Sequence, residues 1–246
     1  MDLRYITHQW PRCSGMSGGK PDMSIKSIII TITAALTVFV GVGATGMLSA
    51  NAATPAPTGC GSPCTDLFSP AFGTATPPAF VLDVRNQAGQ VGEPVIVARA
   101  SGTNPGEDFV LNFQGVVSDF VAAGLMSPGL GALYSNLIVA EIEYVPFGVA
   151  TGFCVGVGAT PGLGTPVTLQ PCGASVRTSW IFDPETTSTG SYDALISGAT
   201  NSNFRHPYSL TTLLPGLQLF TAPMESTLPA KVFAHQLWGQ FQGALP

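Results

Sequence analysis

Charged side chains are scarce in this sequence of 246 residues. Only 9% of the residues are Asp, Glu, Lys or Arg, whereas 45% are hydrophobic, and a typical globular chain is about 25% charged. The 9 Lys and Arg residues are outnumbered by 14 Asp and Glu, which gives a net charge of −5. No basic cluster is present to neutralise phosphates, so we expect no nucleic-acid partner. The high hydrophobicity also excludes a wholly disordered chain.

Groups that commonly perform catalysis are also few. Of 3 histidines, His206 and His235 lie in the body of the chain, each two residues after a Phe, where a packed or surface imidazole is the simpler interpretation. The Gly-x-Ser-x-Gly motif of serine hydrolases is absent. Glu141 and Glu143 would share one face of a strand, an arrangement that can serve glycoside hydrolysis but more commonly makes a solvated face. We therefore predict a protein that is not an enzyme and holds no cofactor or metal.

One long apolar run lies near the N-terminus and predicts export. Residues 28–42 follow Lys26 and precede Ala50-Asn51-Ala52, the order of a secretory signal peptide, which we place at 23–52. A retained membrane anchor is the less favoured alternative, because the run is shorter than the ~20 residues that a span needs. Residues 1–22 fit neither segment and are expected to be a misassigned start or a disordered tail. The mature protein is expected to be secreted and not inserted in the membrane.

Cysteines are few, and their number predicts disulfides. Cleavage after Ala52 leaves Cys60, Cys64, Cys154 and Cys172. An even number of cysteines in an exported chain implies disulfides. Among the three possible pairings, proximity favours Cys60–Cys64 and Cys154–Cys172. A four-cysteine zinc site usually has two close pairs, whereas this chain has one.

The body of the chain predicts short strands. Residues 53–78 are rich in Ala, Thr, Pro and Gly, which favours an extended arm. The only candidate helix is 116–125, which could equally form a pair of strands, because 29 Gly and 21 Pro leave little room for long helices. From residue 79 to 246 we predict an all-β domain. Its expected strands are apolar alternations bounded by Gly, Pro, Asn or Ser at 80–84, 94–98, 109–113, 137–144, 165–169, 180–182, 217–220 and 231–233.

Three segments repeat the same order of motifs. The first runs from Leu82-Asp83-Val84 through 92–97 to 108–111. The second runs through 153–157, 164–169 and 179–182, and a looser third through 208–210, 216–220 and 236–238. Such repetition predicts a threefold pseudosymmetric barrel whose units share one core. The aromatic residue that ends each copy is expected to lie in that core: Phe109, Trp180 and Trp238.

These patterns resemble the ricin-type β-trefoil family with its Gln-x-Trp repeat. The resemblance is carried by the order Asp-Val, Gly-x-Pro-Val and Gln-x-Trp, by the triplet Gln236-Leu237-Trp238, and by the spacing of Cys154 and Cys172, which is similar to the family's intra-repeat disulfide. It covers about residues 79–243 and implies a β-trefoil of three pseudo-repeats. The stretches 144–148, 154–158 and 236–239 also resemble secreted actinobacterial proteins of unassigned function, which implies bacterial export and no activity.

The resemblance implies sugar binding by an Asp, an aromatic platform and an Asn-Gln pair, and no copy keeps all of them. The first copy keeps Asp83, but Ala98 stands at the platform and Gly106 and Glu107 at the amide pair. The other copies are more degenerate. The second has Gly156 at the acid, Gln170 at the platform, and Arg177 and Thr178 at the amide pair. The third keeps Gln236, with Phe220 as a candidate platform, His235 in place of the Asn, and Thr211 or Thr212 in place of the acid.

The first copy is therefore the best remnant of a binding site. Its candidate ligand-binding residues are Asp83, Arg99, Asn104 and Glu107, and the alternative is a turn held by Asp83 and decorated with surface charges. We predict a secreted β-trefoil protein that binds a glycan or an extracellular protein. Two alternatives remain open: a structural protein without a small ligand, and a protease inhibitor that would use an exposed loop at 125–136 or 184–201.

Overall fold

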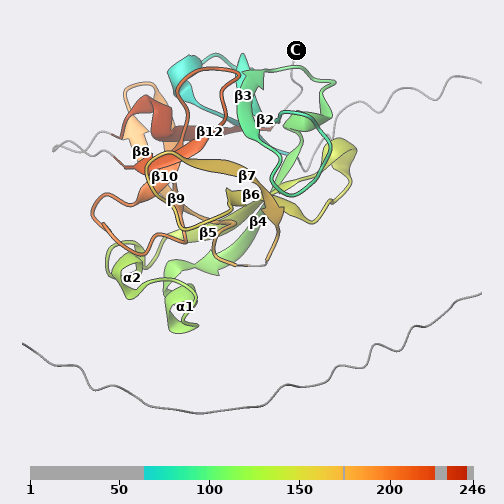
Figure 1. Cartoon of the computed structure of the whole chain (residues 1–246). Coiled ribbons are helices and arrows are strands. Elements are labelled where there is room, and N and C mark those ends of the chain that lie inside the picture. The colour runs from blue at the N-terminus through green and yellow to red at the C-terminus, as the bar shows by residue number, and fades with distance from the viewer. Residues whose placement is uncertain (1–63, 174, 225–231, 243–246) are drawn as a thin grey trace, which may run out of the picture. The chain divides into compact units, whose positions relative to one another are not determined.

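The computed structural model of the chain describes residues 64–173, 175–224 and 232–242 (Figure 1). The described residues are all-β, as the sequence predicts, with two short α-helices, α1 (Val117–Ala122) and α2 (Pro128–Tyr134). The strands are β1 (Asp66–Phe68), β2 (Phe80–Val84), β3 (Val95–Arg99), β4 (Phe109–Val116), β5 (Ile138–Tyr144), β6 (Phe153–Val157), β7 (Thr165–Pro171), β8 (Ser179–Thr187), β9 (Gly190–Ser197), β10 (Tyr208–Thr211), β11 (Phe220–Pro223) and β12 (Leu237–Phe241). Four short 3-10 turns join them: η1 (Pro70–Phe72), η2 (Pro105–Glu107), η3 (Pro146–Gly148) and η4 (Ala234–Gln236).

The strand pairings divide the described chain into three units of four strands: β1–β4, β5–β8 and β9–β12. The second and third strands of each unit form an antiparallel pair: β2 with β3, β6 with β7, and β10 with β11. The fourth strand of each unit pairs with the first strand of the next, and β12 returns to β1. Pairing also closes a ring through β5, β6, β7, β11, β10, β9 and β8. The fold is therefore trefoil-like.

The aromatic residues that end the three copies lie in one buried core, as predicted. Phe109, Trp180 and Trp238 are all at most 1% exposed and belong to the same cluster. Trp180 Nε1 donates a hydrogen bond to the carbonyl of Val155 at 2.8 Å, and Trp238 Nε1 donates to that of Leu210 at 3.1 Å. In both units the indole of the fourth strand is thus fixed to the second strand, whereas Phe109 has no such donor.

The expected arm at 53–78 is wrong for its described part, because β1 is the first strand of the first unit. Leu67 is completely buried in the core and pairs with Gln240 of β12. The Thr65 amide also donates to the carbonyl of Phe109 at 2.8 Å. The folded domain therefore begins before residue 79. The predictions for 1–22 and for the signal peptide at 23–52 fall outside the described residues. Of the expected Cys60–Cys64 pair, Cys60 also lies outside them, whereas Cys64 is described and is disulfide-bonded.

The two helices build a second core on the outside of the barrel strands. Leu130 of α2 is buried against Val139, Ile181 and Ile196, whose neighbours along β5, β8 and β9 face the main core. These strands are apolar on both faces, so the alternation expected at 137–144 and 180–182 is wrong there. The candidate helix at 116–125 forms as α1 over Val117–Ala122, but the expectation that it is the only helix is wrong, because α2 follows it.

Neither segment expected as an exposed inhibitor loop is one. Residues 125–136 contain α2, which begins after the cap Ser127, whose hydroxyl accepts from Gly129 N at 3.3 Å. Residues 184–201 fall mostly in the hairpin of β8 and β9.

Two expected strands also differ from the structure. The expected strand at 231–233 is wrong at Val232 and Phe233, which precede the turn η4. The expected strand at 217–220 begins only at Phe220.

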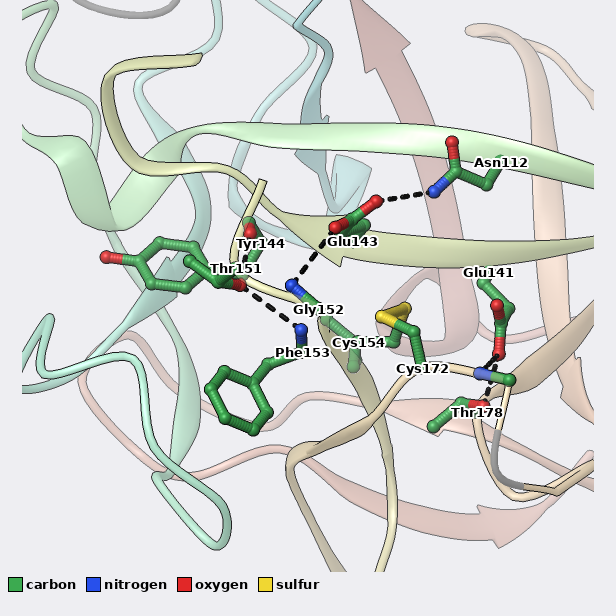
Figure 2. The surroundings of a disulfide bond; sticks show 12 residues. Asn112, Glu141, Glu143, Tyr144, Thr151, Gly152, Phe153, Cys154, Cys172 and Thr178 are labelled. Atoms are coloured by element: carbon green, nitrogen blue, oxygen red, sulfur yellow. Dashed lines mark hydrogen bonds between the residues drawn. A yellow bond between two sulfur atoms is a disulfide. The ribbon is translucent and has the colours of Figure 1, made fainter. Parts of the chain in front are cut away.

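The Cys154–Cys172 disulfide is present, and it joins β6 to the residue after β7 (Figure 2). The two glutamates of β5 lie beside it and are held by hydrogen bonds. Glu141 accepts from Gly173 N at 2.8 Å, and Glu143 accepts from Asn112 Nδ2 at 2.7 Å. Glu141 is buried, so the expectation of a solvated face is wrong for this residue.

None of the helices within the described ranges is long and apolar enough to cross a membrane.

Candidate functional site

Three of the four residues predicted to bind a ligand meet in the first unit. Asp83 lies on β2, Asn104 caps η2, and Glu107 ends η2. Asn104 Nδ2 lies 3.2 Å from Asp83 Oδ2 and 3.0 Å from Glu107 Oε1, so one amide bridges the two carboxylates. The fourth residue, Arg99, is exposed at the end of β3 and forms no hydrogen bond or ion pair with these three within the described chain. The structure does not bring it into this cluster by a hydrogen bond or ion pair, and its part in ligand binding stays a prediction.

The bridged carboxylates are closed off from solvent. Asp83 is 6% exposed and Glu107 is 1% exposed. Gly106 lies directly over Asp83, because a Cβ at this position would stand 2.0 Å from Asp83 Oδ1. The turn is set locally, since Asn104 Oδ1 accepts from Gly106 N at 3.0 Å, a common arrangement at the start of a helical turn. In this conformation the cluster is an internal polar lock and not an open sugar site.

Burial and mutual repulsion hold protons on this cluster. Burial raises the pKa of Glu107 to about 7. The charges of Asp83 and Asp66 also raise this pKa, whereas hydrogen bonds from Ser101 N and Asn104 lower it. Burial and the charge of Asp108 raise the pKa of Asp66 to about 7. Burial also raises the pKa of Asp83. Near neutral pH Glu107 and Asp66 therefore exchange protons, and each can donate as well as accept a hydrogen bond when it is protonated.

The other two units show that the fold does not require these acids. The strand register aligns the three units. Leu67 pairs with the residue two positions after Trp238, Ile142 with the residue two positions after Phe109, and Leu195 with the residue two positions after Trp180. This register aligns Asp66 with Glu141 and Ala194. Glu107 likewise aligns with Thr178 and Gln236, and Asp83 with Gly156 and Thr211. The second unit joins Thr178 Oγ1 to Glu141 at 2.5 Å, and the third joins Gln236 Nε2 to Thr211 Oγ1 at 3.3 Å. The second unit has an acid at only one of the three aligned positions, Glu141, and the third unit has none, so a set of three carboxylates is particular to the first unit.

A shallow depression between the second and third units is open to solvent. It has a volume of about 330 Å³ and is lined by Gly164, Pro166, Gln218, Leu219 and Phe220. Pairing of Phe220 with Pro166 brings β11 against β7 and creates this surface. Gln218 Nε2 donates to the carbonyl of Val167 at 3.1 Å, so the side-chain amide of this lining residue is held by β7.

Exposed leucines flank the depression. Leu163 is 76% exposed and Leu217 is 49% exposed, and each is the chain neighbour of a lining residue. An apolar surface with a few polar groups is typical of small-ligand sites, although this one is at the small end of their usual range. Sequence reasoning identified Phe220 as a candidate platform but missed the others, because 164–166 and 218–220 become neighbours only through strand pairing.

The remaining sequence candidates lie elsewhere. His235 packs its ring edge against Phe72, and His206 Nδ1 lies 3.2 Å from the carbonyl of Met224. Both histidines therefore have structural contacts. Within the described ranges, no three or more His, Cys, Asp or Glu side chains are placed to hold a metal ion.

Comparisons with known proteins give similarity in fold at low identity. No family model and no curated protein matches the chain. Among solved structures, the designed 3-fold symmetric protein ThreeFoil is 15% identical with a TM-score of 0.47, over 72% of this chain and 96% of that one. A mosquitocidal holotoxin is 10% identical with a TM-score of 0.45, over 73% of this chain and 17% of the toxin. These similarities carry no argument about activity or ligand.

Proposed function

We propose that the chain is an exported β-trefoil protein that acts by binding, with a glycan as its ligand. The depression formed by Pro166, Gln218 and Phe220 is the site. The threefold pattern of strand pairs supports the trefoil, and the Cys154–Cys172 disulfide supports an oxidising destination. The single observation that carries the binding proposal is an open depression lined by Phe220, Pro166 and Gln218.

The chemistry of the depression suits a sugar ring. The apolar face of a pyranose stacks on an aromatic ring, and Phe220 and Pro166 offer two flat apolar groups side by side. The Gln218 amide oxygen accepts a hydrogen bond from a hydroxyl group at the edge of the ring. A site with one such acceptor and no described charged group selects neutral sugars weakly, so we expect dissociation constants in the millimolar range for single sugars.

Substitution of Phe220 tests this site. We expect Phe220→Leu to weaken binding of any glycan found on an array by at least about tenfold, because the variant keeps apolar volume and removes the stacking ring. Isothermal titration calorimetry on the full chain measures the effect, and circular dichroism confirms the fold.

Phe113→Leu is the matched control for this experiment. Phe113 is 64% exposed on β4, outside the depression, so its replacement should leave the affinity unchanged. Equal weakening by both variants, or unchanged affinity in Phe220→Leu, would place the glycan elsewhere.

A protein partner is the second candidate. The tips of the three hairpins expose large apolar side chains at Val91, Leu163, Leu213, Leu214 and Leu217. Apolar side chains gathered on a surface are typical of protein contact sites. Loss of a partner on Leu163→Ser together with Leu217→Ser, with no glycan bound by the wild type, would favour this function over sugar binding.

A further inference from the structure

Six residues from the three hairpins form a closed ring of strand pairs. Each hairpin contributes two of them, two positions apart in sequence, and they pair across the seams between the units: Phe220 with Pro166, Thr168 with Pro94, and Ile96 with Gln218. We call these six residues the cap ring. The depression described above lies at the seam of Phe220 and Pro166, so it is one of three related seams.

The three seams share one backbone geometry. Each hairpin has a glycine two positions before its first cap-ring residue, with φ of +85° at Gly92, +80° at Gly164 and +79° at Gly216, a conformation that favours glycine. Each glycine donates its N–H to a carbonyl of the neighbouring unit over 2.7 to 2.9 Å, and the acceptors are Leu169, Thr221 and Val97. The seams therefore differ in their side chains more than in their backbone.

Strand alternation places the cap ring on the outer face of the hairpins. Val95, Val167 and Leu219 each lie between two cap-ring residues in sequence and are completely buried in the main core. Successive residues of a strand point to opposite faces, so the cap-ring side chains point away from that core. Ile96 is the one buried member, and the other five are at least partly exposed.

The seam next to the depression offers similar groups to a ligand. Pro94 and Pro166 occupy equivalent positions in their hairpins, whereas Gln218 holds this position in the third hairpin. Thr168 Oγ1 accepts a hydrogen bond from Gln170 Nε2 at 2.7 Å and keeps its own O–H as a donor. The seam of Pro94 and Thr168 thus places a flat apolar group beside a hydroxyl.

The third seam offers less to a ligand. Ile96 is only 7% exposed, and the Gln218 amide donates to a carbonyl of β7. Arg85 lies beside this seam, where its Nη2 donates to Gly216 O at 2.6 Å. The cap ring itself has no charged side chain. A neutral surface therefore continues from the depression into the seam between the first and second units, and its lack of charge matches a neutral ligand.

We propose that the glycan site extends from the depression across the cap ring, and that its ligand is a neutral oligosaccharide of at least two sugar rings. This inference rests on the proposed function and adds the class of glycan to it. One sugar ring stacks on Phe220 and Pro166, and the next lies on Pro94 and accepts a hydrogen bond from the Thr168 hydroxyl. Pro166 and Thr168 are two residues apart on β7, about 7 Å, which neighbouring rings of one sugar chain can span.

Isothermal titration calorimetry of the full chain tests the length of the ligand. The probes are glucose with cellobiose and cellotriose, mannose with mannobiose and mannotriose, and galactose with galactobiose and galactotriose. Digalacturonic acid is the charged probe. In the series that binds, the disaccharide should bind at least about tenfold more tightly than the single sugar, because only the disaccharide reaches the second seam.

The possible contrary results separate this inference from the proposed function. Equal affinity for a single sugar and its disaccharide would overturn the extension and leave the proposed function standing. Tighter binding of digalacturonic acid than of any neutral disaccharide would overturn the neutral class of ligand. Absence of binding in all series and on a glycan array would refute the proposed function and this inference with it.

Thr168→Val separates the second seam from the first, because it keeps the branched shape and removes the hydroxyl. Disaccharide affinity should fall at least about threefold while single-sugar affinity stays unchanged, whereas Phe220→Leu should weaken both. Thr186→Val, at an exposed threonine of β8, is the matched control and should change neither. Circular dichroism confirms the fold of each variant. Unchanged disaccharide affinity in Thr168→Val, or an equal loss for both sugars, would refute the second seam.

Discussion

Trp180→Ala is expected to destabilise the protein by about 4 kcal/mol, because it removes a large, fully buried side chain and leaves a cavity in the shared core. For a domain of this size, that corresponds to a fall in Tm of roughly 10 °C. Trp180→Phe should cost less, since it keeps a ring and loses only the hydrogen bond to the Val155 carbonyl. Denaturant unfolding followed by circular dichroism measures both values.

Trp238→Ala should cost nearly as much as Trp180→Ala, because the two indoles make equivalent hydrogen bonds in their units. Phe113→Ala is the control, since this exposed ring should change stability by less than about 0.5 kcal/mol. A cost below about 1 kcal/mol for both tryptophans would contradict a common core built by the three units.

Removal of the Cys154–Cys172 disulfide should destabilise the protein by about 3 kcal/mol. The bond closes a loop of 18 residues, which limits the freedom of the unfolded chain. We would replace both cysteines by Ala and compare the free energy of unfolding with that of the oxidised wild type. Alanine avoids leaving a serine hydroxyl at position 154, which is completely buried.

The pair Cys60 and Cys64 offers a matched comparison for the disulfide. These residues are only 4 apart in sequence, so a bond between them would constrain the unfolded chain less, and a double Ala variant should lose less stability. Reductant should lower the Tm of the wild type by about as much as the two double variants do together. An unchanged Tm in the Cys154→Ala/Cys172→Ala variant would show that the bond contributes nothing to stability.

Local features of the sequence predicted the fold class well. Short apolar runs bounded by Gly and Pro marked most strands, and the aromatic ends of three repeated segments identified Phe109, Trp180 and Trp238 as core residues. However, the repeated motifs did not predict the first strand of each unit. The first strands of the three units share no motif, and Asp66-Leu67-Phe68 stands in a Pro- and Ala-rich stretch. Its role depends on pairing with β12, which lies at the other end of the chain.

The candidate site was predictable in part, for a similar reason. Asp83, Asn104 and Glu107 lie within one unit, so their meeting follows from a motif and its turn. Burial was not visible in the sequence, and it converts an expected sugar site into an internal lock with raised pKa values. Arg99 lies at the exposed end of β3, and the sequence did not show that it stands apart from the buried acids.

The sequence alone determined that this protein is sparsely charged, and it correctly predicted an all-β fold of repeated units with a disulfide between Cys154 and Cys172. These properties depend on composition and on residues close together in the chain. The tertiary structure decided which surfaces are open, that Asp83 and Glu107 are buried, and how Phe220 meets Pro166. Such features depend on the register between strands far apart in sequence, and register is fixed only when all three units pack around one core.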